Sequence, residues 1–503
     1  MKILTKTFKR NSTKNFVKRI LILILSAILV CLLCACTKDA QTEGGDTQIN
    51  GRSKEITDKS KQINDKDRDG TGKNTETDNN TAQQNNAENL SHKSGALHFL
   101  CGIDSNCSTE NGYYYLTEET KKLRDENYAT YLMYMDFATC QEIYLCSTAG
   151  CKHDTADCPA VFLYDDFPVF TTKLFVWKEN LYILSREYDD DGGMYENVMS
   201  VGDTQPESSP AVLYKAKLDG TERKQIYTFD SDLTLEDMVV GDENGIYIIT
   251  KKVCTDKAGT FSYMTSSERK LMFLDLESFN IKEICSMDFN DKISWNVTDC
   301  CGNFLILKGI DFGREISKDE KWNDDIYKSL YENSFDVYSI LDLESGTVTE
   351  IYRGSNKYSH SSHVIGDILY LSSSENQNIE GLNIITGEKK TVCTLSQNLI
   401  MDVLGDMLCC RDWNLAGDFT WYFVDTKTGE IYHSSLVNKC NGWDLKFYAE
   451  TASDVLVVND YDAKKGSDES YEIYQMKYAL ISKEDLFSGK ENYRKIKMIG
   501  TGQ

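Results

Sequence analysis

The sequence lacks the short motifs that identify the common hydrolases and nucleotide-binding proteins. It contains no G-x-S-x-G serine elbow and no H-E-x-x-H zinc helix. The segment Gly70-Thr71-Gly72-Lys73 lies in a polar stretch, whereas a phosphate-binding loop joins a strand to a helix. Histidine is scarce, with 6 among 503 residues, and only His360 and His363 form a close pair. These absences remove the usual sequence evidence for a catalytic site, and we expect the two histidines to be exposed or hydrogen-bonded.

Positive charge is in deficit. The chain has 55 Lys and Arg residues against 79 Asp and Glu residues, which gives a formal net charge of -24. An acidic surface repels phosphate backbones, so nucleic acid is not an expected partner.

The first 35 residues are predicted to be a lipoprotein signal peptide. Basic residues precede the apolar run Ile20 to Val30, and no acidic residue lies among them. The run ends at Leu33-Cys34-Ala35-Cys36, which resembles the lipobox of bacterial lipoproteins. We therefore expect Cys36 to carry a lipid that anchors the chain at the extracellular face of the cell membrane. The alternative is an uncleaved transmembrane helix, although the run is near the lower limit for spanning a bilayer.

Residues 36–95 are predicted to be a disordered polar linker. They are rich in Asn, Asp, Thr, Gln, Lys and Gly, and almost free of aromatic and branched apolar residues. Such a segment cannot bury enough apolar surface to offset the entropy lost on ordering. Residues 65–76 have the spacing of an EF-hand calcium loop, but their flanks lack helical periodicity and we attribute the match to composition. We expect the linker to hold the folded domain away from the membrane.

Residues 96–503 contain a recurring pair of β-type segments. The first member follows a polar or glycine-containing turn, and the seven examples are residues 111–116, 180–184, 244–249, 302–307, 366–371, 405–410 and 453–458. The second member is a hairpin, and the seven examples are residues 132–146, 213–227, 272–285, 337–352, 382–395, 421–432 and 473–498. With one apolar segment before each pair, every unit has four strands. This repetition predicts an all-β domain, a monomeric seven-bladed β-propeller. Six or eight blades, or two stacked β-sandwiches, are the alternatives.

Two sequence features suggest a family. One is the pattern from Leu213-Tyr214 to Asp219-Gly220, and the other is the segment from Cys146 to Ala160. Over most of residues 96–503 the chain resembles the TolB-like and low-density-lipoprotein-receptor-like β-propellers of lipoproteins from Gram-positive bacteria. The resemblance implies a propeller fold and an extracellular location. It implies no reaction, because a fold does not determine a function.

The segment of residues 140–158 contains the most unusual chemistry. Cys146, Cys151, His153 and Cys158 provide three thiols and one imidazole, enough for a tetrahedral zinc site if all of them face one point. In an exported protein the commoner use of clustered cysteines is a disulfide, here Cys146 or Cys151 with Cys158. We prefer the disulfide, keep zinc as the alternative cofactor, and expect no other cofactor.

Acidic loops with two tryptophans are predicted between the second and third strands of several units. The candidate ligand-binding residues on these loops are Asp190, Trp322, Asp324, Asp325, Trp413 and Asp460. Tryptophans on polar loops are suited to stacking on sugars or anchoring peptides. We therefore expect a binding or scaffolding module for an extracellular protein, peptide or saccharide. The alternative is a carbohydrate-active lyase or hydrolase that uses acidic loop residues.

Overall fold

The computed structural model describes residues 96–499, with gaps at 103–105, 118–119, 125, 164–170, 186–209, 259–260, 288–292, 317–323, 358–359, 374, 376, 396–398, 414–418, 444 and 466–470. All described residues belong to the unit Gln84–Gln503. No helix in this described part is long and apolar enough to cross a membrane.

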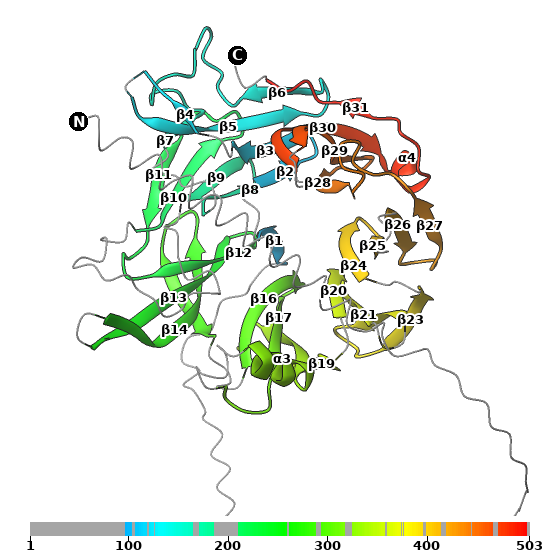
Figure 1. The fold of residues 1–503 in the computed structure, drawn as a ribbon. Coiled ribbons are helices and arrows are strands. Elements are labelled where there is room, and N and C mark those ends of the chain that lie inside the picture. Colours follow the sequence, from blue (N-terminus) through cyan, green and yellow to red (C-terminus); the bar gives the residue numbers. More distant parts are fainter. Residues whose placement is uncertain are drawn as a thin grey trace, which may run out of the picture. The chain divides into compact units, whose positions relative to one another are not determined.

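Seven antiparallel sheets form a ring of four-stranded blades, so the predicted seven-bladed β-propeller is confirmed (Figure 1). Blade one contains β2 (Asn106–Thr109), β3 (Gly112–Leu116), β5 (Tyr128–Asp136) and β6 (Gln141–Tyr144). Blade two contains β8 (Lys173–Trp177), β9 (Asn180–Ser185), β10 (Val212–Lys217) and β11 (Lys224–Thr228). Blade three contains β12 (Thr234–Gly241), β13 (Gly245–Ala258), β14 (Phe261–Asp275) and β15 (Ile281–Ser286). In blades four to seven the strands are β16 (Ile293–Cys301), β17 (Phe304–Asp311), β18 (Phe335–Asp342) and β19 (Val348–Ser355); β20 (His360–Ile365), β21 (Ile368–Ser373), β22 (Asn378–Asn383) and β23 (Lys389–Thr394); β24 (Leu399–Leu404), β25 (Met407–Trp413), β26 (Phe419–Asp425) and β27 (Ile431–Ser434); β28 (Lys446–Glu450), β29 (Asp454–Lys465), β30 (Tyr471–Ser482) and β31 (Arg494–Lys495). Blade one also carries β4 (Lys121–Lys122) and β7 (Val161–Leu163), which both pair with β5.

The predicted strand pairs all form. The seven short runs lie in the second strand of each blade, and the seven hairpins supply the third and fourth strands. The last hairpin has a longer turn, which holds helix α4 (Lys483–Phe487). This helix begins at Ser482, whose side chain accepts a hydrogen bond from the Asp485 amide at 3.1 Å and so caps the first turn.

The second strands explain why the apolar runs are nearly continuous. In β9, Leu181 and Ile183 pack towards blade one, while Tyr182 and Leu184 pack towards blade three. Successive strand residues point to opposite faces, and each blade in a ring has a neighbour on both faces. Both faces of β9 are therefore buried, and the core is divided among the interfaces between blades.

Besides β4, β7 and α4, two further described elements were not predicted from the sequence. Strand β1 (His98–Cys101) pairs with β12, the innermost strand of blade three, and also contacts β8 and β16, so it lies on the inner side of the ring (Figure 1). Just before it, the Leu97 amide donates to the Gly302 carbonyl oxygen at 2.8 Å. Helix α3 (Asp324–Glu332) occupies the connection between β17 and β18, where we expected an acidic loop.

Candidate metal centre

Residues 145–160 form an irregular loop between β6 and β7 of blade one. Tight turns bring its chain back on itself: the Cys151 amide donates to the Thr148 oxygen, and the Cys158 amide to the Thr155 oxygen, both at 3.2 Å. His153 has a φ of 56°, in the left-handed region that most side chains avoid. This backbone conformation places the His153 side chain on the same side of the loop as the cysteines.

The loop brings together the four residues that the sequence singled out. The ligand atoms of Cys146, Cys151, His153 and Cys158 all lie within 4.8 Å of one another, and the His153 Nδ1 atom is 3.2 Å from the Cys158 Sγ atom. Around a tetrahedral zinc ion, ligand atoms are separated by about 3.3–3.8 Å. The four residues can therefore hold a metal ion after inward shifts of about 1 Å or less. In the structure all three cysteines are free thiols, and the choice between a disulfide and a metal ion stays a prediction.

Aromatic packing fixes the histidine. The His153 ring stacks on Tyr144, with centroids 4.2 Å apart and an angle of 24° between the planes. Tyr144 in turn packs edge-on against Tyr131 of β5. The next residue in the loop, Asp154, forms an ion pair with Arg124 in the β4–β5 connection. The imidazole is thus held on blade one independently of any ion.

The surroundings shift the pKa values of His153, Cys146 and Cys158. Burial lowers the pKa of the His153 imidazole, with Asp154 acting in the opposite direction. Burial raises the pKa of the Cys158 thiol to about 12. For Cys146, burial acts to raise the pKa, but hydrogen bonds from Thr148 and from the other two cysteines lower it below the ordinary thiol value. A neutral imidazole is the form that binds metals, and a bound divalent cation would deprotonate the thiols outright.

The far side of the loop is held by blade two. The Arg223 guanidinium donates to the main-chain oxygens of Pro159 and Val161, at 3.0 and 3.3 Å, and lies 4.1 Å from the centre of the Phe162 ring. Arginine is suited to such a site because its planar group can stack and donate in several directions at once. No sequence pattern indicated this role, because Arg223 follows a polar turn, as surface arginines commonly do.

The remaining predicted site residues are only partly described. Cys36, Asp190 and Trp322, together with the EF-hand-like segment, lie outside the described residues. Asp324 and Asp325 begin α3 and Trp413 ends β25, but nothing of their side chains is described. Asp460 forms an ion pair with Lys477 at 3.3 Å, and Lys477 also pairs with Asp462 at 2.6 Å. A shared ligand site among these residues therefore stays a prediction.

The histidine pair is likewise only partly described. His363 is half-buried in β20, and burial lowers its pKa. His360 begins the same strand, but its side chain is not described.

Comparisons with known proteins identify no family by sequence. No protein-family model matches the chain, and no curated protein is similar to it in sequence.

Similar solved structures include a prolyl endopeptidase, with 10% identity and a TM-score of 0.44 over 80% of this chain and 50% of that chain. TolB from Acinetobacter baumannii has 12% identity and a TM-score of 0.30, over 74% of this chain and 78% of that chain. An oligogalacturonate lyase in complex with manganese has 10% identity and a TM-score of 0.34, over 69% of this chain and 86% of that chain. The chain spans about half the length of the prolyl endopeptidase and of a puromycin hydrolase. These likenesses say nothing about a ligand or a reaction.

Proposed function

We propose that this protein is a cell-surface binding or scaffolding module, held at the extracellular face of the cell membrane by a lipid on Cys36. The signal-peptide pattern and the polar composition of residues 36–95 support this location. A propeller suits the role because its rigid blades hold several loops around one end of the ring. The ligand class is a protein, a peptide or a saccharide. No specific observation favours the lyase or hydrolase alternative over binding.

Long hairpins and a helix extend from one end of the ring, and this supports the proposed role. β13 and β14 extend over 14 and 15 residues, and β29 and β30 over 12 residues each, whereas β21 and β22 have 6 residues each. Helix α3 occupies the same connection, between the second and third strands, in blade four. Because the blades share one antiparallel strand order, these connections all open at the same end of the ring.

The exposed aromatic face of α3 is the observation that carries the proposal. Ile326 is 42% exposed, and Tyr327 and Tyr331 are each 37% exposed. Phe335, at the start of β18, is 41% exposed and extends this apolar surface. Aromatic side chains contribute most of the energy at binding interfaces, so their exposure at the projecting end indicates a contact surface.

The chain enters the ring at the opposite end. Leu97 is hydrogen-bonded to Gly302, which lies in the turn between the first and second strands of blade four. Such turns open at the end that faces away from α3. An anchored linker that joins the ring there leaves the α3 end free to meet a partner.

Binding to defined libraries tests the role. The full chain in detergent would be probed with a displayed peptide library and with an array of cell-surface oligosaccharides. For a ligand found this way, the double variant Tyr327→Ser, Tyr331→Ser should weaken binding by about tenfold or more. Ile385→Ser is the control, because Ile385 is 58% exposed in a turn at the other end of the ring. Equal losses in the two variants, or no ligand in either library, would contradict the proposal.

We further propose that Cys146, Cys151, His153 and Cys158 bind one zinc ion. Three thiolates and an imidazole form a soft donor set that suits zinc, and four protein ligands leave no open position for a substrate. The expected role of the ion is therefore structural. The purified full chain should contain about one equivalent of zinc. A metal-free protein whose loop thiols react only after reduction would have the disulfide instead.

A further inference from the structure

Among the described strands, none belongs to both the first and the last blade. The four strands of blade seven all come from the end of the chain, and those of blade one from its start. Tyr113 and Met135 of blade one pack against Leu456, Val458 and Leu480 of blade seven. We use the term closing seam for the contacts that blade seven and residues 496–499 make with blade one.

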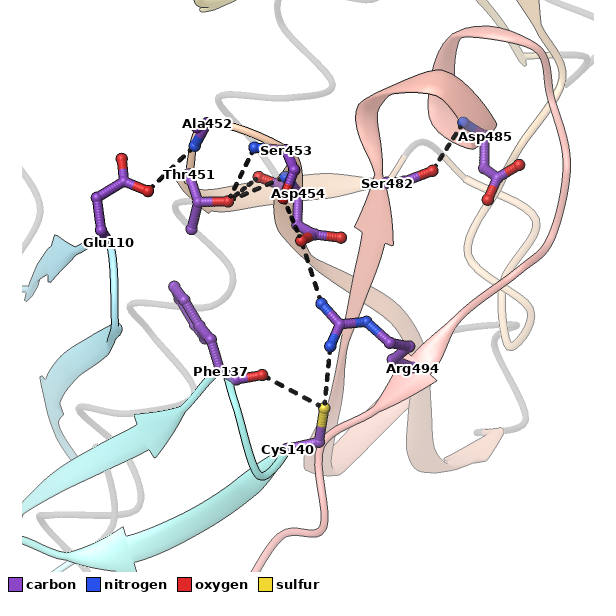
Figure 2. Close-up of polar contacts among 10 residues, drawn as sticks. All are labelled: Glu110, Phe137, Cys140, Thr451, Ala452, Ser453, Asp454, Ser482, Asp485 and Arg494. Atoms are coloured by element: carbon purple, nitrogen blue, oxygen red, sulfur yellow. Dashed lines mark hydrogen bonds and ion pairs between the residues drawn. The ribbon is translucent and has the colours of Figure 1, made fainter.

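Polar contacts join blade seven to blade one at the closing seam (Figure 2). The Ala452 amide donates to the Glu110 carboxylate at 3.2 Å. Arg494 pairs with Asp454 at 3.2 Å and also donates to the Cys140 sulfur at 3.9 Å, so it joins blade seven to the turn before β6.

Residues 496–499 lie along the outer edge of β6. The Lys497 amide donates to the Cys140 oxygen at 2.8 Å, and the Glu142 amide donates to the Lys497 oxygen at 3.0 Å. Gln141 and Lys497 form a parallel bridge. Residues 496–499 therefore cover an edge strand that would otherwise expose unpaired main-chain groups.

A buried carboxylate completes this contact. Glu142 is only 6% exposed, and it accepts hydrogen bonds from the Tyr115 hydroxyl and, at 2.5 Å, from the Ile499 amide. Because a buried charge without partners is costly, loss of the Ile499 amide would leave Glu142 poorly satisfied.

The metal centre shares an apolar cluster with the same segment. Cys158 is a buried member of this cluster, and Cys146, Cys151 and Ile499 pack against it. The loop also continues directly from β6, because Cys146 is two residues beyond Tyr144, the last residue of that strand. Strand β6 is thus held by the metal centre at its end and by residues 496–499 along its edge.

We infer that a zinc ion bound by the metal centre fastens the closing seam, so that zinc binding and docking of residues 496–499 on β6 strengthen each other. This inference rests on the proposed zinc site. The loop of residues 145–160 contains no helix or strand, and four bonds to one ion remove most of its alternative conformations. The contacts with Tyr144, Arg124 and Arg223 hold parts of this loop, and a bound ion would further restrict the surface against which Ile499 packs. Coupling between two binding events is reciprocal, so each must strengthen the other by the same factor.

Amide hydrogen exchange on the full chain in detergent tests the forward direction. Zinc-loaded protein would be compared with protein stripped by a chelator. Exchange of the Glu142, Lys497 and Ile499 amides should accelerate by about tenfold or more on zinc removal. The amides of β21 in blade five, far along the ring, should be unchanged. Equal exchange in the two forms would overturn the inference, and so would faster exchange throughout the ring, because the effect would then be general unfolding.

Zinc affinity tests the reverse direction. Ile499→Ala should weaken zinc binding by the same factor by which zinc removal accelerates exchange of the amides at the closing seam. The matched variant Ile385→Ala should leave the zinc affinity unchanged. If wild-type protein binds no zinc, the zinc site itself is wrong. If it binds zinc with an affinity that Ile499→Ala leaves unchanged, the site stands and the coupling is refuted.

Discussion

Gly220, in the turn between β10 and β11 of blade two, lies against the main-chain oxygen of Leu145, and a Cβ atom at position 220 would be only 2.7 Å from that oxygen. Leu145 immediately precedes Cys146, the first ligand of the metal centre. The close approach of Gly220 thus fixes where the loop leaves β6. It also gives a physical reason for glycine in the Asp219-Gly220 turn that the sequence pattern contains.

Substitution at this contact should destabilise the protein. Gly220 has a φ of 78°, so Gly220→Ala adds a backbone cost to the clash with Leu145, and we expect a loss of about 2–4 kcal/mol. Gly150→Ala is the matched control: its φ is 72° but a Cβ there meets nothing within 4 Å, so the backbone cost alone, about 1 kcal/mol, should remain. Urea unfolding measures the loss in the free energy of unfolding for each variant. Equal losses in the two variants would show that the Leu145 contact is unimportant.

Removing the histidine ligand should separate metal binding from packing. His153→Ala should lower the zinc content well below one equivalent and lower the melting temperature of the zinc-loaded protein. In chelated protein the same substitution should cost little, because His153 is a half-exposed loop residue. His433→Ala, on the outer strand β27, is the control. A melting temperature that chelation does not change in wild-type protein would argue against a structural ion.

His363 should make stability depend on pH. Burial lowers its pKa in the folded state below the ordinary value of 6.5, so the unfolded chain binds a proton more readily. Its contribution to stability is therefore complete above pH 6.5 and is lost as the pH falls through the folded-state pKa. His363→Gln should lack this loss, and the stability difference between the two proteins should change in the variant's favour on acidification. A difference that stays constant from pH 8 to pH 5 would contradict the assignment.

The lipid anchor is tested by Cys36→Ser in the native host. The variant should be released from the membrane fraction or accumulate as the unprocessed precursor, because the thiol is the only site for the lipid. Fractionation and mass spectrometry of the N-terminus measure this. Membrane retention of a correctly cleaved, lipid-free variant would refute the anchor.

The blades could be predicted from the sequence because each is encoded locally. In blade two, Asn180 follows a turn, residues 181–184 form an apolar run, and a hairpin follows within the same unit. The order and spacing of the strands can therefore be predicted from the sequence of each unit. Strand β1 could not be predicted in this way. Its partner β12 lies far along the chain, and four residues carry too little pattern to specify a distant pairing.

Helix α3 was missed for a related reason. Ile326, Tyr327, Leu330 and Tyr331 have helical spacing, but nine residues give a weak periodic signal, and the acidic residues that precede them suggested a loop.

For the metal centre, the spacing predicted the donor set but not its convergence. That convergence depends on turns at Thr148 and Thr155, on the left-handed conformation of His153, and on the packing of Tyr144. The sequence-based preference for a disulfide rested on the cellular compartment rather than on any residue of the loop.

The position of β1 determines how the ring would bear a load. A pull on residue 96 acts along a strand that is hydrogen-bonded edge to edge with β12, so the bonds between β1 and β12 resist together in shear and do not open one at a time. Leu97 and Cys101 are buried in the packing between blades three and four and between blades two and three. Tension from an anchored linker would therefore enter the ring on its inner side, through the first strands of blades one to four.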